Sequence, residues 1–259
     1  MKLDKHAPGT FCWVELGTTD TTAAEAFYRG LFGWDAQRHP MPQGGEYLMW
    51  KLEGAQAGGG YRLSPQQLEM HVPPHWLLYV CVEDAAAAVA RVNELGGKVL
   101  MGPSPVGENG IIAVVQDPQG AYLGLWQPLG HSGSSVVNEP NAFCWAELAA
   151  RDAVGARDFY GQLFGWGTKI SQMGPVEYTE FQSGGQSAAG MVQMDAQWGD
   201  MPPHWMAYFQ VADCDAAAAQ AGALGAKIGV PPTDIPPVGR FAVVADPQGA
   251  HFSVIKLNE

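Results

Sequence analysis

A duplication within the chain limits its possible folds more than any other feature. Residues 11–16 (FCWVEL) return as residues 143–148 (FCWAEL). Two later motifs recur in the same way: PPHW at 73–76 and 202–205, and DPQGA at 117–121 and 246–250. Because the motifs keep their order, we expect two halves that share one fold.

Each half divides again into two similar units. The first unit predicts a strand over 11–17, then a helix that Asp20 caps and Gly33 ends. The pattern restarts with a strand over 76–83 and an alanine-rich helix after Asp84. Three short strands follow each helix, near residues 35–39, 46–53, 56–63, 98–101, 111–116 and 122–127. The second half repeats this order, with helices near 153–164 and 214–224.

The prediction is an α+β fold of four βαβββ modules. We expect one domain over residues 1–129 and a second over 140–259, each built from two modules. Residues 130–139 are rich in Gly and Ser and are expected to form a linker. The sequence leaves open whether the modules pair within a half or across the halves, the first with the fourth.

Composition narrows the possible partners. Hydrophobic residues make up 47% of the 259 residues, as in a globular protein, and the net charge is −12. An acidic surface repels nucleic acid and anionic lipid, so a small molecule is the expected partner. No long apolar segment suggests a membrane span, and the four cysteines are read as reduced thiols. We therefore expect a cytoplasmic protein, either a monomer or a homodimer.

The strand–Asp–helix unit with Phe27-Tyr28 and Leu31-Phe32-Gly33 resembles the first module of the vicinal oxygen chelate superfamily. This superfamily includes glyoxalase I, bleomycin-resistance proteins and extradiol dioxygenases. The Asp-Pro-Gln-Gly-Ala stretches resemble its second module, and the tandem arrangement is similar to glyoxalase-like proteins labelled hydroxylases. The resemblance implies two glyoxalase-like domains, each with a sheet curled into a cup that holds a metal. An enzyme, if this is one, would be a lyase or an oxidoreductase.

The residues at the metal-ligand positions of that family cannot bind a metal. The first-strand ligand falls on Trp13 and Trp145, and its counterpart in the second module falls on Leu77 and Met206. The last-strand glutamate falls on Gly124 and Ser253. We therefore predict no metal at the usual position and no other cofactor. A divalent metal held by non-standard ligands stays open, including a weaker candidate in the loops at His71-x-x-x-His75 and Asp200-x-x-x-His204.

Other side chains could replace the missing ligands. Because alternate residues of a strand share a face, Glu15 and Glu147 are expected to point into the cups beside the two tryptophans. The same reasoning places His75, His204 and His251 on cup faces, with Tyr122 as the counterpart of His251. Each glutamate is read either as a base with a raised pKa or as a structural carboxylate. Each proline-preceded histidine is read as catalytic or as a loop-end side chain bonded to a carbonyl.

Two functions follow from these residues. The first is an enzyme that acts on a small oxygenated metabolite, with Glu147, His204, His251, Glu15 and His75 as candidate catalytic residues. The second is a metal-free protein that sequesters a planar ligand against Trp13, Trp145, Tyr122, Leu77, Met206 and Ser253. Because histidine accepts a proton near neutral pH and tyrosine does not, we expect any chemistry in the second half. Three other tryptophans, Trp34, Trp126 and Trp166, are expected to pack between helix and sheet.

Overall fold

The computed structural model describes residues 3–41, 44–173 and 176–258, and it contains two eight-stranded sheets. The predicted domain limits Met1 and Glu259 lie outside these residues. The first sheet comprises β1 (Phe11–Thr18), β2 (Asp35–Pro40), β3 (Glu46–Leu52), β4 (Ala55–Arg62), β5 (His75–Cys81), β6 (Lys98–Val106), β7 (Gly110–Gln116) and β8 (Tyr122–Pro128). The second comprises β9 (Phe143–Ala150), β10 (Gly167–Met173), β11 (Val176–Ser183), β12 (Gln186–Gln193), β13 (His204–Gln210), β14 (Lys227–Ile235), β15 (Gly239–Ala245) and β16 (His251–Leu257).

The modules pair within each half. The strand orders are β2-β3-β4-β1-β5-β8-β7-β6 and β10-β11-β12-β9-β13-β16-β15-β14. In both sheets the first strands of the two modules, β1 with β5 and β9 with β13, join antiparallel at the centre. The fold is thus the expected α+β arrangement of four βαβββ modules, and the question of cross-half strand pairing is answered.

Helix ends follow the sequence signals closely. The four module helices are α1 (Thr21–Phe32), α3 (Ala85–Glu94), α4 (Ala153–Phe164) and α5 (Cys214–Ala223). Asp20, Asp84, Asp152 and Asp213 accept backbone N–H bonds at their N-termini, and Gly33 and Gly165 end α1 and α4 in the left-handed region. Two short elements were not predicted: α2 (Pro65–Glu69) and the 3-10 turn η1 (Ala196–Trp198).

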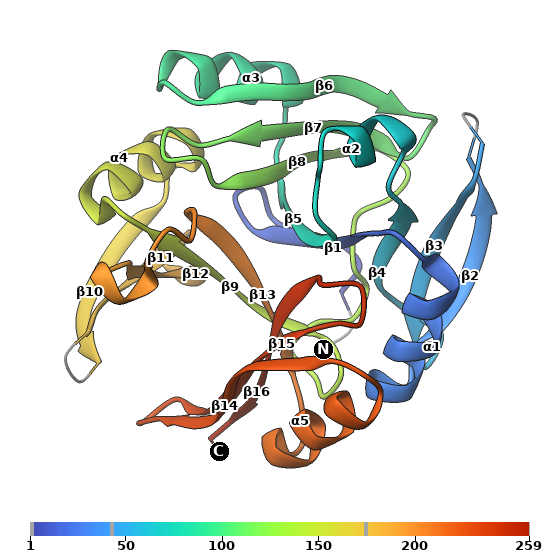
Figure 1. Cartoon of the computed structure of the whole chain (residues 1–259). Coiled ribbons are helices and arrows are strands. Elements are labelled where there is room, and N and C mark those ends of the chain that lie inside the picture. The colour runs from blue at the N-terminus through green and yellow to red at the C-terminus, as the bar shows by residue number, and fades with distance from the viewer. Residues whose placement is uncertain (1–2, 42–43, 174–175, 259) are drawn as a thin grey trace.

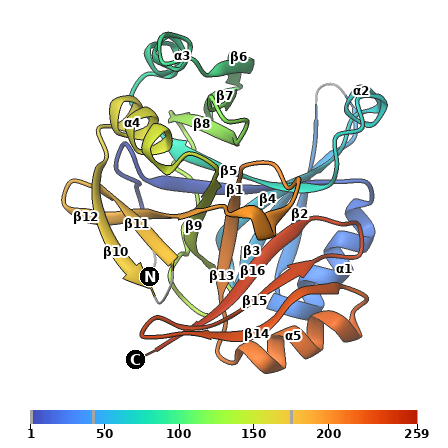
Figure 2. The same cartoon turned by 60° about the vertical axis from the view of Figure 1, so that its left-hand side comes forward.

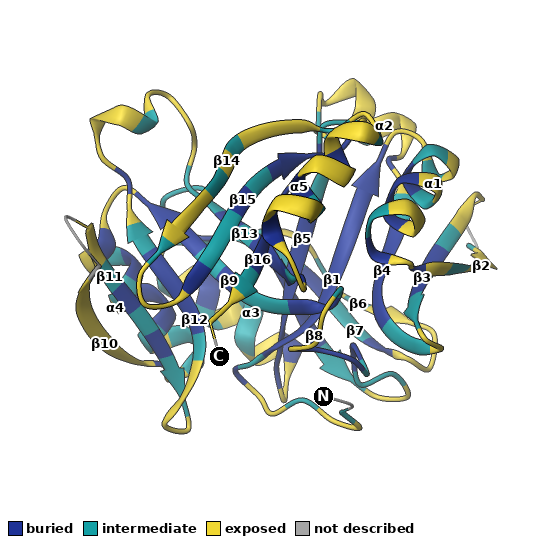
Figure 3. Ribbon diagram, turned by 90° about the horizontal axis from the view of Figure 1, so that it is seen from below, coloured by how far each residue is buried: buried dark blue, intermediate teal, exposed yellow. Residues whose placement is uncertain are grey.

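The helices pack across the two halves even though the strands do not. Helix α1 lies beside α5, and α4 lies beside α3, so the first helix of each half contacts the other half (Figures 1 and 2). Buried side chains of both halves form one continuous core on the helical side of the sheets. Rings of Phe32 in α1 and Phe209 in β13, for example, lie 5.2 Å apart between centroids. Figure 3 shows the buried central strands beneath helices whose outer faces are exposed.

A reciprocal pair of buried hydrogen bonds joins the halves. The hydroxyl of Tyr28 donates to Asp246 of the second half at 2.9 Å and accepts from the Trp76 indole at 3.0 Å. Tyr160 repeats this with Asp117 of the first half and with Trp205. The two motifs that suggested the family, Phe-Tyr and Asp-Pro-Gln-Gly-Ala, therefore meet across the boundary between the halves.

Trp34 and Trp166 belong to this shared core as expected, but the placement predicted for Trp126 is wrong. Trp126 lies on the concave face of the first sheet, in a cluster with Trp13 and Leu77. Alternation along β8 explains the error, because Leu125 already faces the helical core. Among the described residues no helix is long and apolar enough to cross a membrane.

Candidate site in the concave faces of the sheets

The centre of the first cup is a carboxylate held by two tyrosines. Glu15, on β1, accepts a hydrogen bond from Tyr47 of β3 at 2.7 Å and another from Tyr79 of β5 at 2.8 Å. The Trp13 indole donates to the Tyr47 hydroxyl at 3.1 Å. The side chain of Glu15 is only 9% exposed, so these bonds replace the water that a carboxylate would otherwise bind.

The second cup repeats this quartet. Tyr208 of β13 donates to Glu147 at 2.7 Å, and the Trp145 indole donates to Tyr178 of β11 at 2.9 Å. Tyr178 lies close enough to Glu147 that, after burial, the carboxylate charge raises the pKa of its hydroxyl. We define the two groups as the first quartet (Trp13, Glu15, Tyr47 and Tyr79) and the second quartet (Trp145, Glu147, Tyr178 and Tyr208).

Glycines make room for the tyrosines. A Cβ atom added at Gly59 would lie 1.9 Å from the Tyr47 hydroxyl, and one at Gly190 would lie 1.8 Å from that of Tyr178. At Gly124, where the family places a metal-binding glutamate, an added Cβ would lie 2.2 Å from the Tyr79 ring. The ring therefore occupies the space from which that glutamate would reach a metal.

Burial and hydrogen bonding act on the glutamates in opposite directions. Burial raises the pKa of Glu15 and of Glu147 above the usual range for a carboxyl, while the tyrosine hydroxyls partly offset the rise. Burial, and then the nearby carboxylate charge, raises the pKa of Tyr79 and Tyr208 far above the usual tyrosine value. The tyrosines thus remain protonated donors, and the glutamate is the acceptor at the centre of each quartet.

The residues of the cups do not fit the metal centre of the family. The strand register sets Trp13 opposite Tyr79 and Glu15 opposite Leu77, and the central carboxylates Glu15 and Glu147 are already bonded to tyrosines. Among the described residues, no three His, Cys, Asp or Glu side chains come together in a way that could hold an ion.

The histidines lie at the ends of the strands. The imidazole Nδ1 atoms of His75 and His204 lie 2.8 and 2.9 Å from the carbonyl oxygens of Pro73 and Pro202. Burial is the main cause that lowers the pKa of His204, and the charge of His251 lowers it further. The groups that shift the pKa of Glu147 are Tyr208 and Tyr178. Neither histidine is among these groups, so the predicted grouping of Glu147 with His204 and His251 is replaced by contacts of Glu147 with tyrosines.

The other predicted site residues differ in exposure. Tyr122 is 55% exposed at the start of β8, and Leu77 is buried beside Trp13. Ser253 is fully buried, and its hydroxyl has no hydrogen-bond partner among the described residues. The tyrosines of the quartets were missed. The alternation that placed His75 and Leu77 in the cup also places Tyr79 there, so this residue could have been found from the sequence.

The two cups are closed to different extents. In the first, the His131 ring lies edge-on to Trp13 with 4.8 Å between centroids, and the Trp126 indole donates to the His131 carbonyl. Ser134 bonds the Cys12 carbonyl, so the segment that joins the halves packs against the end of this cup. Trp13 is 7% exposed as a result, whereas Trp145 has no ring neighbour among the described residues and is partly exposed. Glu147 and Met206 are likewise more exposed than Glu15 and Leu77.

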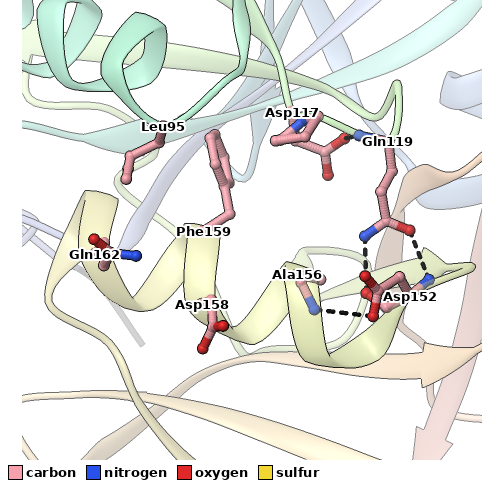
Figure 4. A pocket seen from close by; sticks show the side chains of 10 residues that line it. Leu95, Asp117, Gln119, Asp152, Ala156, Asp158, Phe159 and Gln162 are labelled. Carbon is pink, nitrogen blue, oxygen red and sulfur yellow. Dashed lines mark hydrogen bonds between the residues drawn. The ribbon is translucent and has the colours of Figure 1, made fainter.

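A separate cavity of about 210 Å³ lies between α3 and α4, on the helical side of the sheets (Figure 4). Its polar groups bond one another: the Gln119 amide donates to the Asp152 carbonyl at 2.9 Å and accepts from the Asp152 N–H at 2.7 Å. These bonds connect the halves, so we assign this cavity a structural role and take the cups as the candidate sites.

Comparison with known proteins gives matches along most of the chain. Residues 13–125 match the glyoxalase-like domain family, and residues 142–254 match the glyoxalase/bleomycin resistance protein/dioxygenase superfamily. CFP32 of Mycobacterium tuberculosis, whose name marks it as a proposed glyoxylase, is 38% identical over 98% of this chain and 97% of its own length. The anthracycline biosynthesis protein DnrV of Streptomyces peucetius is 33% identical over 99% of this chain and 96% of its own.

Solved structures show the same fold at low sequence identity. A Mn(II)-bound glyoxalase from Novosphingobium aromaticivorans has a TM-score of 0.64 at 16% identity, covering 97% of this chain and 83% of its own. An extradiol ring-cleaving dioxygenase from B. fuscum has a TM-score of 0.66 at 13% identity, covering 100% and 75%.

Proposed function

Because this chain belongs to the glyoxalase/bleomycin resistance protein/dioxygenase superfamily, we propose that its second cup binds a small, planar, oxygenated metabolite and that Glu147 acts on it as a base. The observation that carries this proposal is the second quartet. A carboxyl with a raised pKa lies beside an indole, in the more exposed of the two cups. A flat ligand could stack against Trp145 while a polar edge reaches Glu147.

The reaction class that suits these groups is proton transfer at a carbon next to a carbonyl. The Glu147 carboxylate would take the proton from carbon, and the electron pair would move onto the carbonyl oxygen. Tyr208 and Tyr178 lose their charged acceptor once Glu147 is protonated, and they then become available as donors. No step requires a metal. The names of the relatives, a proposed glyoxylase and an anthracycline biosynthesis protein, favour a carbonyl compound and a fused aromatic compound, respectively.

The second candidate is binding without turnover, as in the bleomycin-resistance proteins. The specific observation in its favour is that tyrosine rings fill the space at the family's metal positions in the first cup. In that case Trp145 would hold a planar ligand and Glu147 would accept a hydrogen bond from it.

A ligand panel separates these outcomes. We would measure turnover and tryptophan quenching with dicarbonyls, thiol adducts, catechols and hydroxylated anthraquinones, with added Mn²⁺ and with chelator. We expect turnover of one class that persists in chelator. It should fall about 100-fold or more in Glu147→Gln, as for loss of a general base. The matched variant Glu15→Gln should keep its activity.

Three results would contradict the assignment of a metal-free base in the second cup. Activity that disappears only in Glu15→Gln would assign the chemistry to the first cup. Activity that chelator abolishes and Mn²⁺ restores would show a metalloenzyme with non-standard ligands. Quenching without turnover, lost in Trp145→Phe, would show a binding protein.

A further inference from the structure

Two cysteines from neighbouring strands meet in the first cup. Cys12 lies on β1 and Cys81 on β5, which pair antiparallel. The register of this pair shifts between Phe11 and Trp13, so Cys12 occupies a β-bulge. The bulge turns both Cys12 and Trp13 toward the concave face, where they join Cys81 in one buried cluster.

The surroundings of the two thiols give them different roles. The Cys12 thiol donates to the Tyr79 carbonyl at 3.5 Å, and that of Cys81 donates to the His6 carbonyl at 3.6 Å. Contact with the Cys12 side chain is the main cause that lowers the pKa of Cys81, whereas burial raises the pKa of Cys12. Because the thiolate is the reactive form, Cys81 is the readier nucleophile and Cys12 is its resolving partner.

We propose that Cys12 and Cys81 form a redox-active dithiol that closes to a disulfide when the protein meets hydrogen peroxide. The Cys81 sulfur attacks one peroxide oxygen, the O–O bond breaks, and the departing hydroxide takes a proton to become water. The Cys12 sulfur then attacks the resulting sulfenic acid, the S–S bond forms, and a second water leaves. The two thiols lose two electrons, and these reduce the peroxide.

The two cysteines lie diagonally across the strand pair. The Cys81 N–H donates to the Thr10 carbonyl, two residues before Cys12, and both cysteine side chains belong to one buried cluster. Both thiols are buried, at 1% and 2% exposure, beneath the segment that precedes β1. Main-chain bonds from Gly9 to Cys81 and from Leu3 to Ser135 hold that segment. Peroxide is small, so a brief local opening of this segment is enough for it to reach Cys81.

The second half provides an internal control. Cys144 occupies the bulge position of Cys12, but the counterpart of Cys81 is Gln210, so no second thiol is near it. Burial raises the pKa of Cys144 to about 12. The dithiol is therefore confined to the first half and separate from the proposed base Glu147.

The test is peroxide treatment of the folded protein, followed by thiol counting after denaturation and by peptide mapping. We expect two thiols to disappear, a mass lower by two hydrogen atoms, and a cross-linked peptide pair containing Cys12 and Cys81. Dithiothreitol should reverse all three changes. Cys144→Ser should behave like the wild type, whereas Cys12→Ser should yield Cys81 oxidised without a cross-link.

Other outcomes would overturn the proposal. Oxidation of Cys144 or Cys214 at the same rate as Cys81 would show that reactivity does not depend on the pair. Loss of thiols in the wild type without a cross-linked peptide would show separate oxidation of each residue. Four thiols left intact at peroxide concentrations that oxidise free cysteine fully would show that the pair is inert in the folded protein.

Discussion

At the scale of single residues, each cup is centred on a carboxyl that accepts a hydrogen bond from tyrosine. An ionised Glu147 gains this hydrogen bonding but loses its water, and burial has the larger effect on its pKa. The folded state therefore binds a proton at this site more strongly than the unfolded state does. A buried carboxyl of this kind reduces stability at neutral pH, a cost that active sites commonly carry.

This cost predicts how stability changes with pH. Because the pKa of Glu147 is higher in the folded state, the free energy of unfolding falls as pH rises from about 4 through the folded value. Glutamine cannot ionise, so Glu147→Gln should stabilise the protein relative to wild type at pH 7.5 more than at pH 4. A one-unit difference in pKa corresponds to about 1.4 kcal/mol. Urea unfolding at the two pH values measures the effect.

Glu180, two strands away on β11 in the same sheet, is the matched control. Bonds from Ser187 and Gln182 lower its pKa in the folded state, so its contribution has the opposite sign. That contribution is present above the unfolded pKa and disappears as pH falls through the folded value. Glu180→Gln should therefore cost more stability at pH 7.5 than at pH 3. A Glu147→Gln effect of equal size at both pH values would show that this carboxyl has no raised pKa.

The sequence predicted the glutamate and the tryptophan at the centre of each cup, but not the tyrosines that bond the glutamate. Alternation along β1 and β9 places Glu15 and Glu147 beside Trp13 and Trp145, because one strand suffices for that inference. Tyr47 and Tyr178 come from a different strand, and their reach depends on register and on the glycines beneath them. That information comes from strand pairing, which one sequence does not contain.

At the scale of elements, helices α1 and α4 each carry a tyrosine into the opposite half. Their ends were predictable because a capping Asp and a terminal Gly are local signals. Their partners were not predictable, since a helix that packs on its own sheet shows the same apolar periodicity as one that also packs on a neighbour. The Tyr28–Asp246 and Tyr160–Asp117 bonds identify those partners.

Removing one of these hydroxyls should be costly. Tyr28→Phe leaves the buried Asp246 oxygen and the Trp76 indole without their partner, which costs roughly 1–3 kcal/mol for an unsatisfied buried group. Tyr122→Phe is the control: Tyr122 is 55% exposed, so we expect a change within about 0.5 kcal/mol. Urea denaturation compares the two variants. Equal stability of Tyr28→Phe and wild type would mean that the bond between the halves contributes nothing net.

At the scale of the whole molecule, the halves share one core despite having separate sheets. The duplication predicted two similar folds, and the structure shows them. The duplication did not predict that the helices of each half are partly buried by the other half. The motifs that make the contacts between the copies are themselves repeated, but the repeat pattern does not say whether a motif binds within its own half or in the other.

A shared core predicts that the halves unfold together. Calorimetry should give one transition whose van't Hoff and calorimetric enthalpies agree. Tyr28→Phe, a change in the first half, should lower the midpoint of that single transition without splitting it. Two separable transitions, with only one shifted by the substitution, would show that the halves are thermodynamically independent.

The segment that joins the halves has a consequence for how this protein can change over time. Spacers between repeated domains usually tolerate insertions and deletions, because they need only span a distance. Here His131 rests on Trp13, and Ser134 bonds the end of β1, so the spacer is also a wall of the first cup. A change in its length would therefore alter how the first cup is closed. In this chain, selection on the packing of that cup and selection on domain spacing act on the same few residues.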